Sequence, residues 1–135
     1  MKRFLIYAAI PALIILSACS NGNKNEVIKT TPEEILKAYQ GGTSIGDQKF
    51  KDKKVEVTGV IDEVDRDVNG VPFVTFTLDN EVLPVFNFKK EQAKVVDSLK
   101  TGDKATLVCV GAGELLKTPT FNDCELAGSN VPAAK

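Results

Sequence analysis

The sequence predicts one mainly β domain: a five-stranded Greek-key barrel with a helix between strands 3 and 4 and an extra N-terminal helix. Three observations lead to this prediction. Five segments are predicted as strands, and the first three show the apolar alternation of a half-buried strand. Turn-forming pairs such as Asn69-Gly70 separate some of them. A stretch with helical spacing follows the third segment, as in barrels whose helix closes one end.

The N-terminal helix is predicted from its start and stop signals. A Thr-x-x-Glu capping box with proline at the first helical position opens it at Thr31, and Gly41-Gly42 ends it. The apolar residues between these signals have helical spacing. Residues 43–53 show no clear period and are expected to form a loop.

The predicted strands are 54–65, 73–78, 82–88, 105–110 and 119–126. The first strand is long and carries Gly59, which predicts a bulge or bend where the strand turns a barrel corner. Pro84 indicates an irregular stretch in the third strand. Residues 91–100 form the predicted helix between strands 3 and 4. An open α+β sheet built from the same elements is the alternative fold.

The N-terminal segment has the three regions of a secretory signal. Lys2 and Arg3 precede an apolar run that ends at Ile15, and Leu16-Ser17-Ala18-Cys19 then places a cysteine behind small residues. This stretch resembles the bacterial lipobox, which implies cleavage before Cys19, diacylation of its thiol and usually a third acyl chain such as palmitate on its amine. The run is shorter than the roughly 20 residues that span a bilayer. An uncleaved membrane anchor or a buried helix is the alternative.

Cleavage before Cys19 would divide the chain into four parts. These are a signal peptide (1–18), a polar tether (19–30), the OB-like barrel domain (31–127) and a loose C-terminal tail (128–135). The protein is then expected in the cell envelope, anchored to a membrane by lipid and facing the periplasm or the exterior. Ser20 favours the outer membrane if the cell has two membranes.

Composition argues against most enzyme classes. The sequence contains no His, which removes Ser-His-Asp and Cys-His catalysis and the common zinc sites. No catalytic residue, cofactor or metal ion is therefore expected. Loss of Lys2 and Arg3 with the signal peptide would lower the formal charge from −1 to −3. A mildly acidic domain is a poor match for unspecific nucleic-acid binding, which depends on Lys and Arg.

Cys109 and Cys124 remain once Cys19 is assigned to lipid. A pair of cysteines in a small secreted domain predicts a disulfide, here across the final hairpin. That pairing implies one antiparallel register with both cysteines facing the core. The other opposed pairs of this register are Leu107 with Leu126 and Gly111 with Asn122. Two buried free thiols are the alternative.

Residues 65–70, Asp-Arg-Asp-Val-Asn-Gly, imitate the opening of an EF-hand calcium loop. Such a loop needs a bidentate carboxylate at its twelfth position. Counted from Asp65, that position is Phe76. The segment is therefore interpreted as a charged hairpin turn without metal.

Barrels of this type often bind ligands on the outer face of strands 2 and 3. Alternation places five residues outward on these strands: Phe73, Thr75, Thr77, Leu83 and Val85. Only Phe73 could stack on a base, and Glu56 and Asp62 on the first strand would repel phosphate. Nucleic acid is therefore not an expected partner. The apolar positions Phe73, Leu83 and Val85 form a candidate binding face for a protein or peptide, although burial under the N-terminal helix would explain them equally well.

Several segments resemble the tRNA_anti-like family of OB-fold proteins. The resemblance covers about residues 34–126. Its motifs are Val-Thr-Gly-Val-Ile-Asp-Glu-Val at 57–64 with Asp67 and Gly70, Pro-Phe-Val at 72–74, Leu-Lys-Thr-Gly-Asp-Lys-Ala-Thr at 99–106 and Asp-Cys-Glu-Leu at 123–126. It implies an OB fold and offers no catalytic residue to this chain. Many members look like small secreted or lipidated proteins.

These observations predict a membrane-anchored extracytoplasmic lipoprotein whose OB-like domain is a protein-binding or accessory module. An envelope protein or peptide is the expected partner. The alternative is an oligonucleotide-binding or small-ligand-binding OB-fold protein of the envelope, and a hydrolytic enzyme comes last. The salt dependence of binding distinguishes a protein-binding module from an oligonucleotide-binding one. Nucleic-acid binding weakens steeply as salt rises, whereas an apolar protein contact does not.

Overall fold

The computed structural model describes residues 26–127. Its elements, in chain order, are β1 (Ile28–Thr30), α1 (Pro32–Gln40), α2 (Thr43–Phe50), β2 (Lys54–Arg66), β3 (Pro72–Phe76), β4 (Val85–Phe88), the 3-10 helix η1 (Lys90–Gln92), α3 (Ala93–Asp97), β5 (Lys104–Leu115) and β6 (Thr118–Leu126). The predicted signal peptide, Cys19 and the C-terminal tail lie outside the described residues. Within residues 26–127, no helix is long and apolar enough to cross a membrane.

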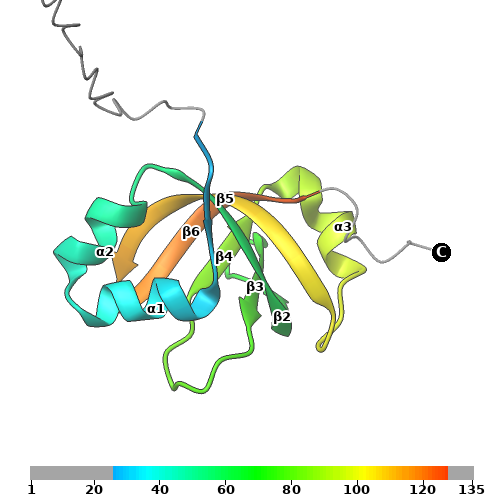
Figure 1. The fold of residues 1–135 in the computed structure, drawn as a ribbon. Coiled ribbons are helices and arrows are strands. Elements are labelled where there is room, and N and C mark those ends of the chain that lie inside the picture. The colour runs from blue at the N-terminus through cyan, green and yellow to red at the C-terminus, as the bar shows by residue number, and fades with distance from the viewer. Residues whose placement is uncertain (1–25, 128–135) are drawn as a thin grey trace, which may run out of the picture.

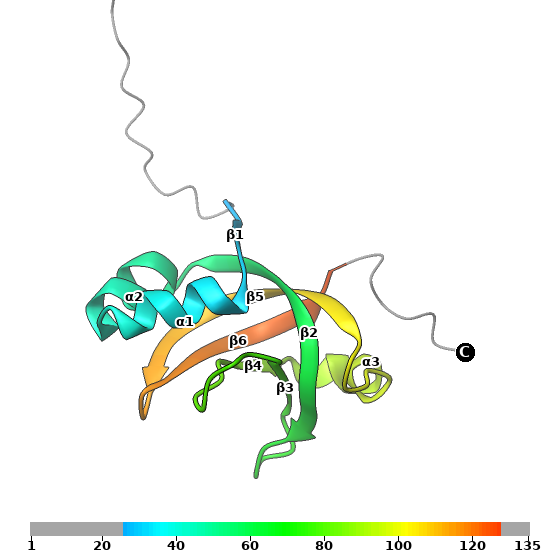
Figure 2. The ribbon, with the colours of Figure 1, turned by 60° about the horizontal axis from the view of Figure 1, so that its bottom comes forward.

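Strands β2 to β6 close into a five-stranded mixed barrel, which confirms the predicted fold (Figure 1). β2 pairs antiparallel with β3 and with β5. β3 pairs antiparallel with β4, and β5 with β6. The barrel closes through a parallel contact between β4 and β6. Figure 2 shows α1 and α2 together at one end of this barrel and α3 at the other.

Aromatic side chains fill the barrel. Phe50, Phe76, Phe86 and Phe121 are fully buried. The ring of Phe86 lies 5.1 Å from each of the rings of Phe76 and Phe121, and Phe121 lies 6.1 Å from Phe50, measured between ring centroids. Burial of each such side chain stabilises a fold by about 1.5–3 kcal/mol. Phe76 of β3 and Phe86 of β4 thus face the interior of the barrel.

The bend of β2 has a different cause from the one predicted. Its register shifts between Ile61 and Glu63, not at Gly59. Gly59 is needed for another reason, since a Cβ there would lie 2.8 Å from the ring of Phe76. Glycine lets the β2 backbone approach that ring closely.

The register shift also changes which acidic residues lie beside β3. Glu63 lies opposite Thr75, and Asp65 lies opposite Phe73. The predicted neighbours were Glu56 and Asp62, and this part of the prediction is wrong. Glu56 belongs to the half of β2 that pairs with β1 and β5. An extra residue in a strand reverses the alternation beyond it.

Helix α2 occupies the segment that was expected to be a loop. It buries only Gly46 and Phe50, which is too little for an apolar period to show in the sequence. Gly42, at φ 141°, joins it to α1. At the start of α1, Thr31 Oγ1 accepts a hydrogen bond from the Glu34 N–H at 3.2 Å. This bond confirms the threonine half of the predicted capping box. The Glu34 carboxylate does not complete the box; it accepts a hydrogen bond from Thr30 Oγ1 at 2.9 Å.

Three boundaries differ from the prediction. Residues 28–30 were assigned to the tether but form β1, which pairs in parallel with β2 and buries Thr30. The helix predicted for 91–100 is shorter, because η1 and α3 together cover Lys90–Asp97. β4 begins only at Val85, directly after Pro84, as expected of a residue that cannot donate to a ladder.

Candidate binding face on β3, β4 and β6

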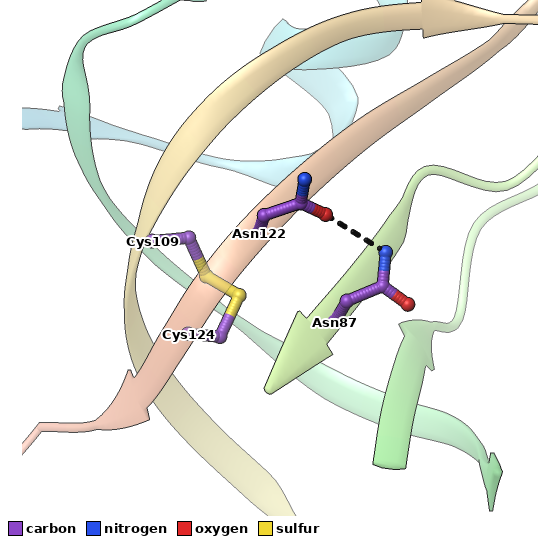
Figure 3. The surroundings of a disulfide bond; sticks show 4 residues. All are labelled: Asn87, Cys109, Asn122 and Cys124. Carbon is purple, nitrogen blue, oxygen red and sulfur yellow. Dashed lines mark hydrogen bonds between the residues drawn. A yellow bond between two sulfur atoms is a disulfide. The ribbon is translucent and has the colours of Figure 1, made fainter. Parts of the chain in front are cut away.

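The outer face of β3, β4 and β6 carries aromatic, aliphatic and amide side chains. Its residues, called the outer face below, are Phe73, Val85, Asn87, Thr120 and Asn122. Phe73 lies opposite Asn87 on β4, and Val85 lies opposite Thr120 on β6. Asn87 Nδ2 donates a hydrogen bond of 3.1 Å to Asn122 Oδ1, and so links β4 to β6 (Figure 3).

The three predicted binding residues divide between this face and its edge. Phe73 and Val85 are half-buried on the outer face, and Leu83 is half-buried in the connection before β4. None of them belongs to the apolar cluster that forms the core of residues 26–127. Helix α1 packs mainly against α2, β2 and β6. The N-terminal helix is therefore a poor explanation for the partial burial of Phe73 and Val85. Leu83 differs, because the connection that carries it lies beside α1, where Val82 shares a hollow with Leu36 and Tyr39.

Thr75 departs from the prediction that it would be exposed on this face. It is 5% exposed. Its Oγ1 has no hydrogen-bond partner among the described residues. Thr77, in contrast, is exposed as predicted.

A hollow of about 360 Å³ lies at one end of the outer face. Its lining includes the two amides of the outer face together with Asp67 and Asp123. Asp67 also shapes the turn between β2 and β3, because its Oδ1 accepts hydrogen bonds from the N–H groups of Asn69 (2.8 Å) and Val71 (2.9 Å). The carboxylates can accept hydrogen bonds from a polar ligand group, and the amides can both accept and donate them.

The EF-hand-like segment forms this turn. Gly70 adopts φ 78°, and its N–H donates to the Asp67 carbonyl at 2.9 Å. Phe76, at the twelfth position of the motif, is fully buried in the barrel. In the part of the chain that the structure describes, no group of three or more potential metal ligands is suitably placed. The absence of a bound metal stays a prediction.

Three acidic residues border the outer face. Asp65 lies opposite Phe73, and Asp67 and Asp123 line the hollow. None of these three carboxylates takes part in a salt bridge between described residues. Lys89, at the end of β4, contacts Glu125 at 2.6 Å. This pair raises the pKa of Lys89 and lowers that of Glu125, mainly through their hydrogen bond.

A disulfide-capable pair joins β5 to β6, the strand that carries Asn122. The sulfur atoms of Cys109 and Cys124 are 2.03 Å apart, and both residues are buried (Figure 3). Leu107 lies opposite Leu126, as predicted. Gly111 lies opposite Phe121 and not opposite Asn122, so this part of the predicted register is wrong.

Asp123 causes that difference. Val108 lies opposite Glu125 and Val110 opposite Asn122, which leaves one extra residue on β6. Asp123 adopts φ 53°, in the left-handed region. The bulge brings consecutive residues of β6 to the outer face and places the Asp123 carboxylate at the hollow.

Sequence reasoning missed the amide pair and a second exposed feature. Asn87 and Asn122 are 35 residues apart, and no local pattern predicts their contact. Leu115 and Leu116 lie at the tip of a β5–β6 hairpin that is longer than predicted. Two leucines beside a glycine-containing segment (Gly111-Ala-Gly113) were a usable signal for an exposed hairpin tip.

The closed barrel with a single parallel contact between β4 and β6, closed at one end by α3, defines an OB-fold domain. The tRNA_anti-like family matches residues 1–125, and the chain belongs to this family. The resemblance noted in the sequence is therefore confirmed. No curated protein matches the chain in sequence.

Two solved structures are similar to the chain. The first is described as a candidate nucleic acid-binding lipoprotein from Klebsiella pneumoniae, with a TM-score of 0.63 and 20% identity over 75% of this chain and 92% of that one. The second is yeast Stn1 and Ten1, with a TM-score of 0.45 and 11% identity over 78% of this chain and 65% of that one. At 20% identity, the first similarity establishes the fold alone.

Proposed function

We propose that the protein is a lipid-anchored envelope protein that acts as a binding module and not as an enzyme. Its outer face would bind a segment of another protein that carries apolar and basic side chains. The observation that supports this most directly is the arrangement around Phe73. This half-exposed ring lies opposite Asp65 on β2, and two further carboxylates, Asp67 and Asp123, line the adjoining hollow.

The chemistry of this arrangement favours a basic and apolar partner. Burial of Phe73 and Val85 would remove apolar surface from water. Basic side chains would neutralise carboxylates that have no salt bridge within residues 26–127. The nearby Lys89 is already paired with Glu125 and adds little free positive charge.

Oligonucleotide binding is the second candidate. The similar structure from Klebsiella pneumoniae is described as a candidate nucleic acid-binding lipoprotein, and this gives no support to the expectation that nucleic acid is an unlikely partner. Barrels of this fold bind oligonucleotides through the corresponding face, and Phe73 could stack on one base. The acidic residues that border the outer face argue against it, because phosphate would approach carboxylates that have no salt bridge within residues 26–127.

Binding of defined probes to the mature lipidated chain separates the two candidates. The probes are a peptide of alternating Lys and Phe, the same peptide with Glu in place of Lys, and a single-stranded oligothymidine. We expect the Lys/Phe peptide to bind best. Phe73→Ala should weaken it about tenfold, the equivalent of about 1.4 kcal/mol. Asp65→Asn should weaken it as well, whereas Ile45→Ala, on the exposed side of α2, should not.

The outcomes are distinct. Tight binding of oligothymidine that falls steeply with salt would replace the proposal by the second candidate. Equal binding of the Lys and Glu peptides would contradict the role given to the carboxylates.

The lipid anchor is a separate part of the proposal. It is supported by the signal-like residues that lead to Cys19. Two or three acyl chains would hold the protein on a membrane, whereas one gives only marginal binding. We expect Cys19→Ala to accumulate as an unprocessed precursor without lipid label, while Ser17→Ala, which keeps a small residue, is processed. Mature, soluble protein from Cys19→Ala would contradict the anchor. Ser20 favours the outer membrane in a cell with two membranes.

A further inference from the structure

The hairpin between β5 and β6 holds two leucines in solvent. Leu115 is 67% exposed and Leu116 is 92% exposed. Leu116 (φ 49°) and Lys117 (φ 65°) are the two loop residues, and both lie in the left-handed region. Turns of this kind favour Asn and Gly, because a larger side chain crowds the backbone there. A large apolar side chain therefore projects from a position where sterics and solvent both disfavour it.

A hollow of about 200 Å³ borders the same turn. Its apolar lining comes from Leu36 and Tyr39 of α1, Val82 of the β3–β4 connection and Pro119 of β6, and its polar lining includes Glu114 and Lys117. The last two residues flank the leucines in the sequence, which places the projecting tip at the rim of the hollow. The hollow is smaller than the roughly 300–1,000 Å³ of small-molecule pockets. Its size suits a side chain of another protein.

We infer that this end of the barrel is an interface between two copies of the chain, in which Leu116 of each copy enters the hollow of the other. Projection and hollow lie side by side in one patch, so the patch is self-complementary. In a dimer with two-fold symmetry, the leucine of each copy can fill the hollow of the other, and no further copy can be added at this interface. Glu114 and Lys117 have opposite charges, and the same axis places the rim of each copy against the rim of the other.

Other occupants fit the patch less well. A bilayer surface would cover the leucines but would leave the neighbouring hollow unfilled. The β3–β4 connection at its edge also carries Asp79 and Glu81, which would face anionic lipid headgroups. The interface lies away from the outer-face hollow: β2 and β5 are antiparallel, so the tip of β5 and the β2–β3 turn are at opposite ends of the barrel.

Paired cysteines test the inference in intact cells. Two full-length chains with different tags are co-expressed, one with Leu116→Cys and the other with Val82→Cys, and are oxidised mildly. We expect a disulfide between the two tagged chains. The matched control replaces Leu116→Cys by Val68→Cys, a fully exposed residue at the opposite hairpin, and should give no crosslink. The native pair Cys109 and Cys124 is buried and does not compete.

A second measurement follows the oligomeric state of the detergent-solubilised full chain by sedimentation. We expect a dimer at micromolar concentration and at least tenfold weaker association for Leu116→Ser, with an unchanged circular dichroism spectrum. Val68→Ser should behave as the parent chain does. A parent chain that stays monomeric, a Leu116→Cys chain that crosslinks only to a different protein, or a Leu116→Ser change that abolishes contact with lipid but not self-association would each overturn the inference.

Discussion

Leu116 and Lys117 show how one turn can be unfavourable for the fold. Both residues have positive φ, and the left-handed region costs a residue with a side chain about 1–2 kcal/mol. The sequence has Asn-Gly in the turn between β2 and β3, so the favourable solution occurs elsewhere in the same chain. A cost at an exposed turn is typical of a residue kept for a contact and not for stability.

The double substitution Leu116→Asn/Lys117→Gly should raise the free energy of unfolding by about 1 kcal/mol, because Asn and Gly tolerate positive φ. Urea denaturation at a concentration where both chains are monomeric measures this. The same variant should lose self-association, so the turn's effect on stability can be measured separately from its role in the dimer. A variant that is less stable than the parent would show that the leucine makes a stabilising contact within its own chain.

Tyr39 gives the fold a dependence on alkaline pH. Burial raises the pKa of its phenol, and the hydrogen bond that it donates to Asp47 Oδ1 at 3.1 Å raises it further. The folded state therefore favours the neutral phenol. Its contribution is complete below the unfolded pKa of about 10 and is lost as pH rises through the raised folded pKa.

Tyr39→Phe should remove this part of the pH dependence. Above pH ~10, the parent should lose stability with rising pH more steeply than the variant, whereas near pH 8 the variant should be less stable by about 1 kcal/mol because it lacks the hydrogen bond. Urea midpoints over this range provide the comparison. Parallel curves for the two chains would contradict the assignment.

At the scale of elements, α2 is joined to the barrel through close backbone contact with β5. The Gly111 N–H donates to the Lys53 carbonyl at 3.0 Å, and the Asp52 N–H donates to the Gly111 carbonyl at 2.8 Å. A Cβ on Gly111 would lie 2.0 Å from the Phe50 carbonyl oxygen. Only glycine allows the end of α2 to lie this close to the strand.

Gly111→Ala should therefore lower the free energy of unfolding by about 3 kcal/mol, since rigid backbone must move to make room. Gly41→Ala is the matched control, because a Cβ there meets its nearest neighbour at 3.4 Å and the φ of −70° suits alanine. Thermal and urea unfolding of both variants measure the difference. Equal stability of the two variants would contradict the close contact.

Elements with a strong period could be predicted from the sequence, and elements defined by tertiary contact could not. The core residues of β3 and β4 alternate, so Phe76 and Phe86 were placed correctly. α2 was not predicted, because a helix with two buried residues has no apolar stripe. The bulge at Asp123 has no glycine to mark it. The alternation gave the outward positions of Phe73 and Val85, but Asn122 joins them only through the parallel contact of β4 with β6.

At the scale of the whole molecule, Cys109 and Cys124 join β5 to β6, the last hairpin of the barrel. Their separation of 15 residues corresponds to about 3 kcal/mol in the chain-entropy view of a disulfide. This is a large share of the roughly 5–15 kcal/mol that stabilises a typical domain.

We predict that the pair is oxidised in the protein taken from cells, and that Cys109→Ala/Cys124→Ala lowers the free energy of unfolding by about 3 kcal/mol. Peptide mapping without reductant identifies the bond directly. Recovery of two alkylatable thiols in the folded, unreduced protein would refute it.

The most direct test of the binding face is photo-crosslinking from position 73 in intact cells. Benzoylphenylalanine replaces Phe73 in the full-length chain, and the crosslinked product is identified by mass spectrometry. The proposal predicts a protein adduct whose crosslinked peptide carries basic residues, lost when Asp65→Asn and Asp123→Asn are added, and no adduct from the same group at position 45 on α2. A nuclease-sensitive adduct, or a peptide adduct that is indifferent to the two carboxylates, would contradict it.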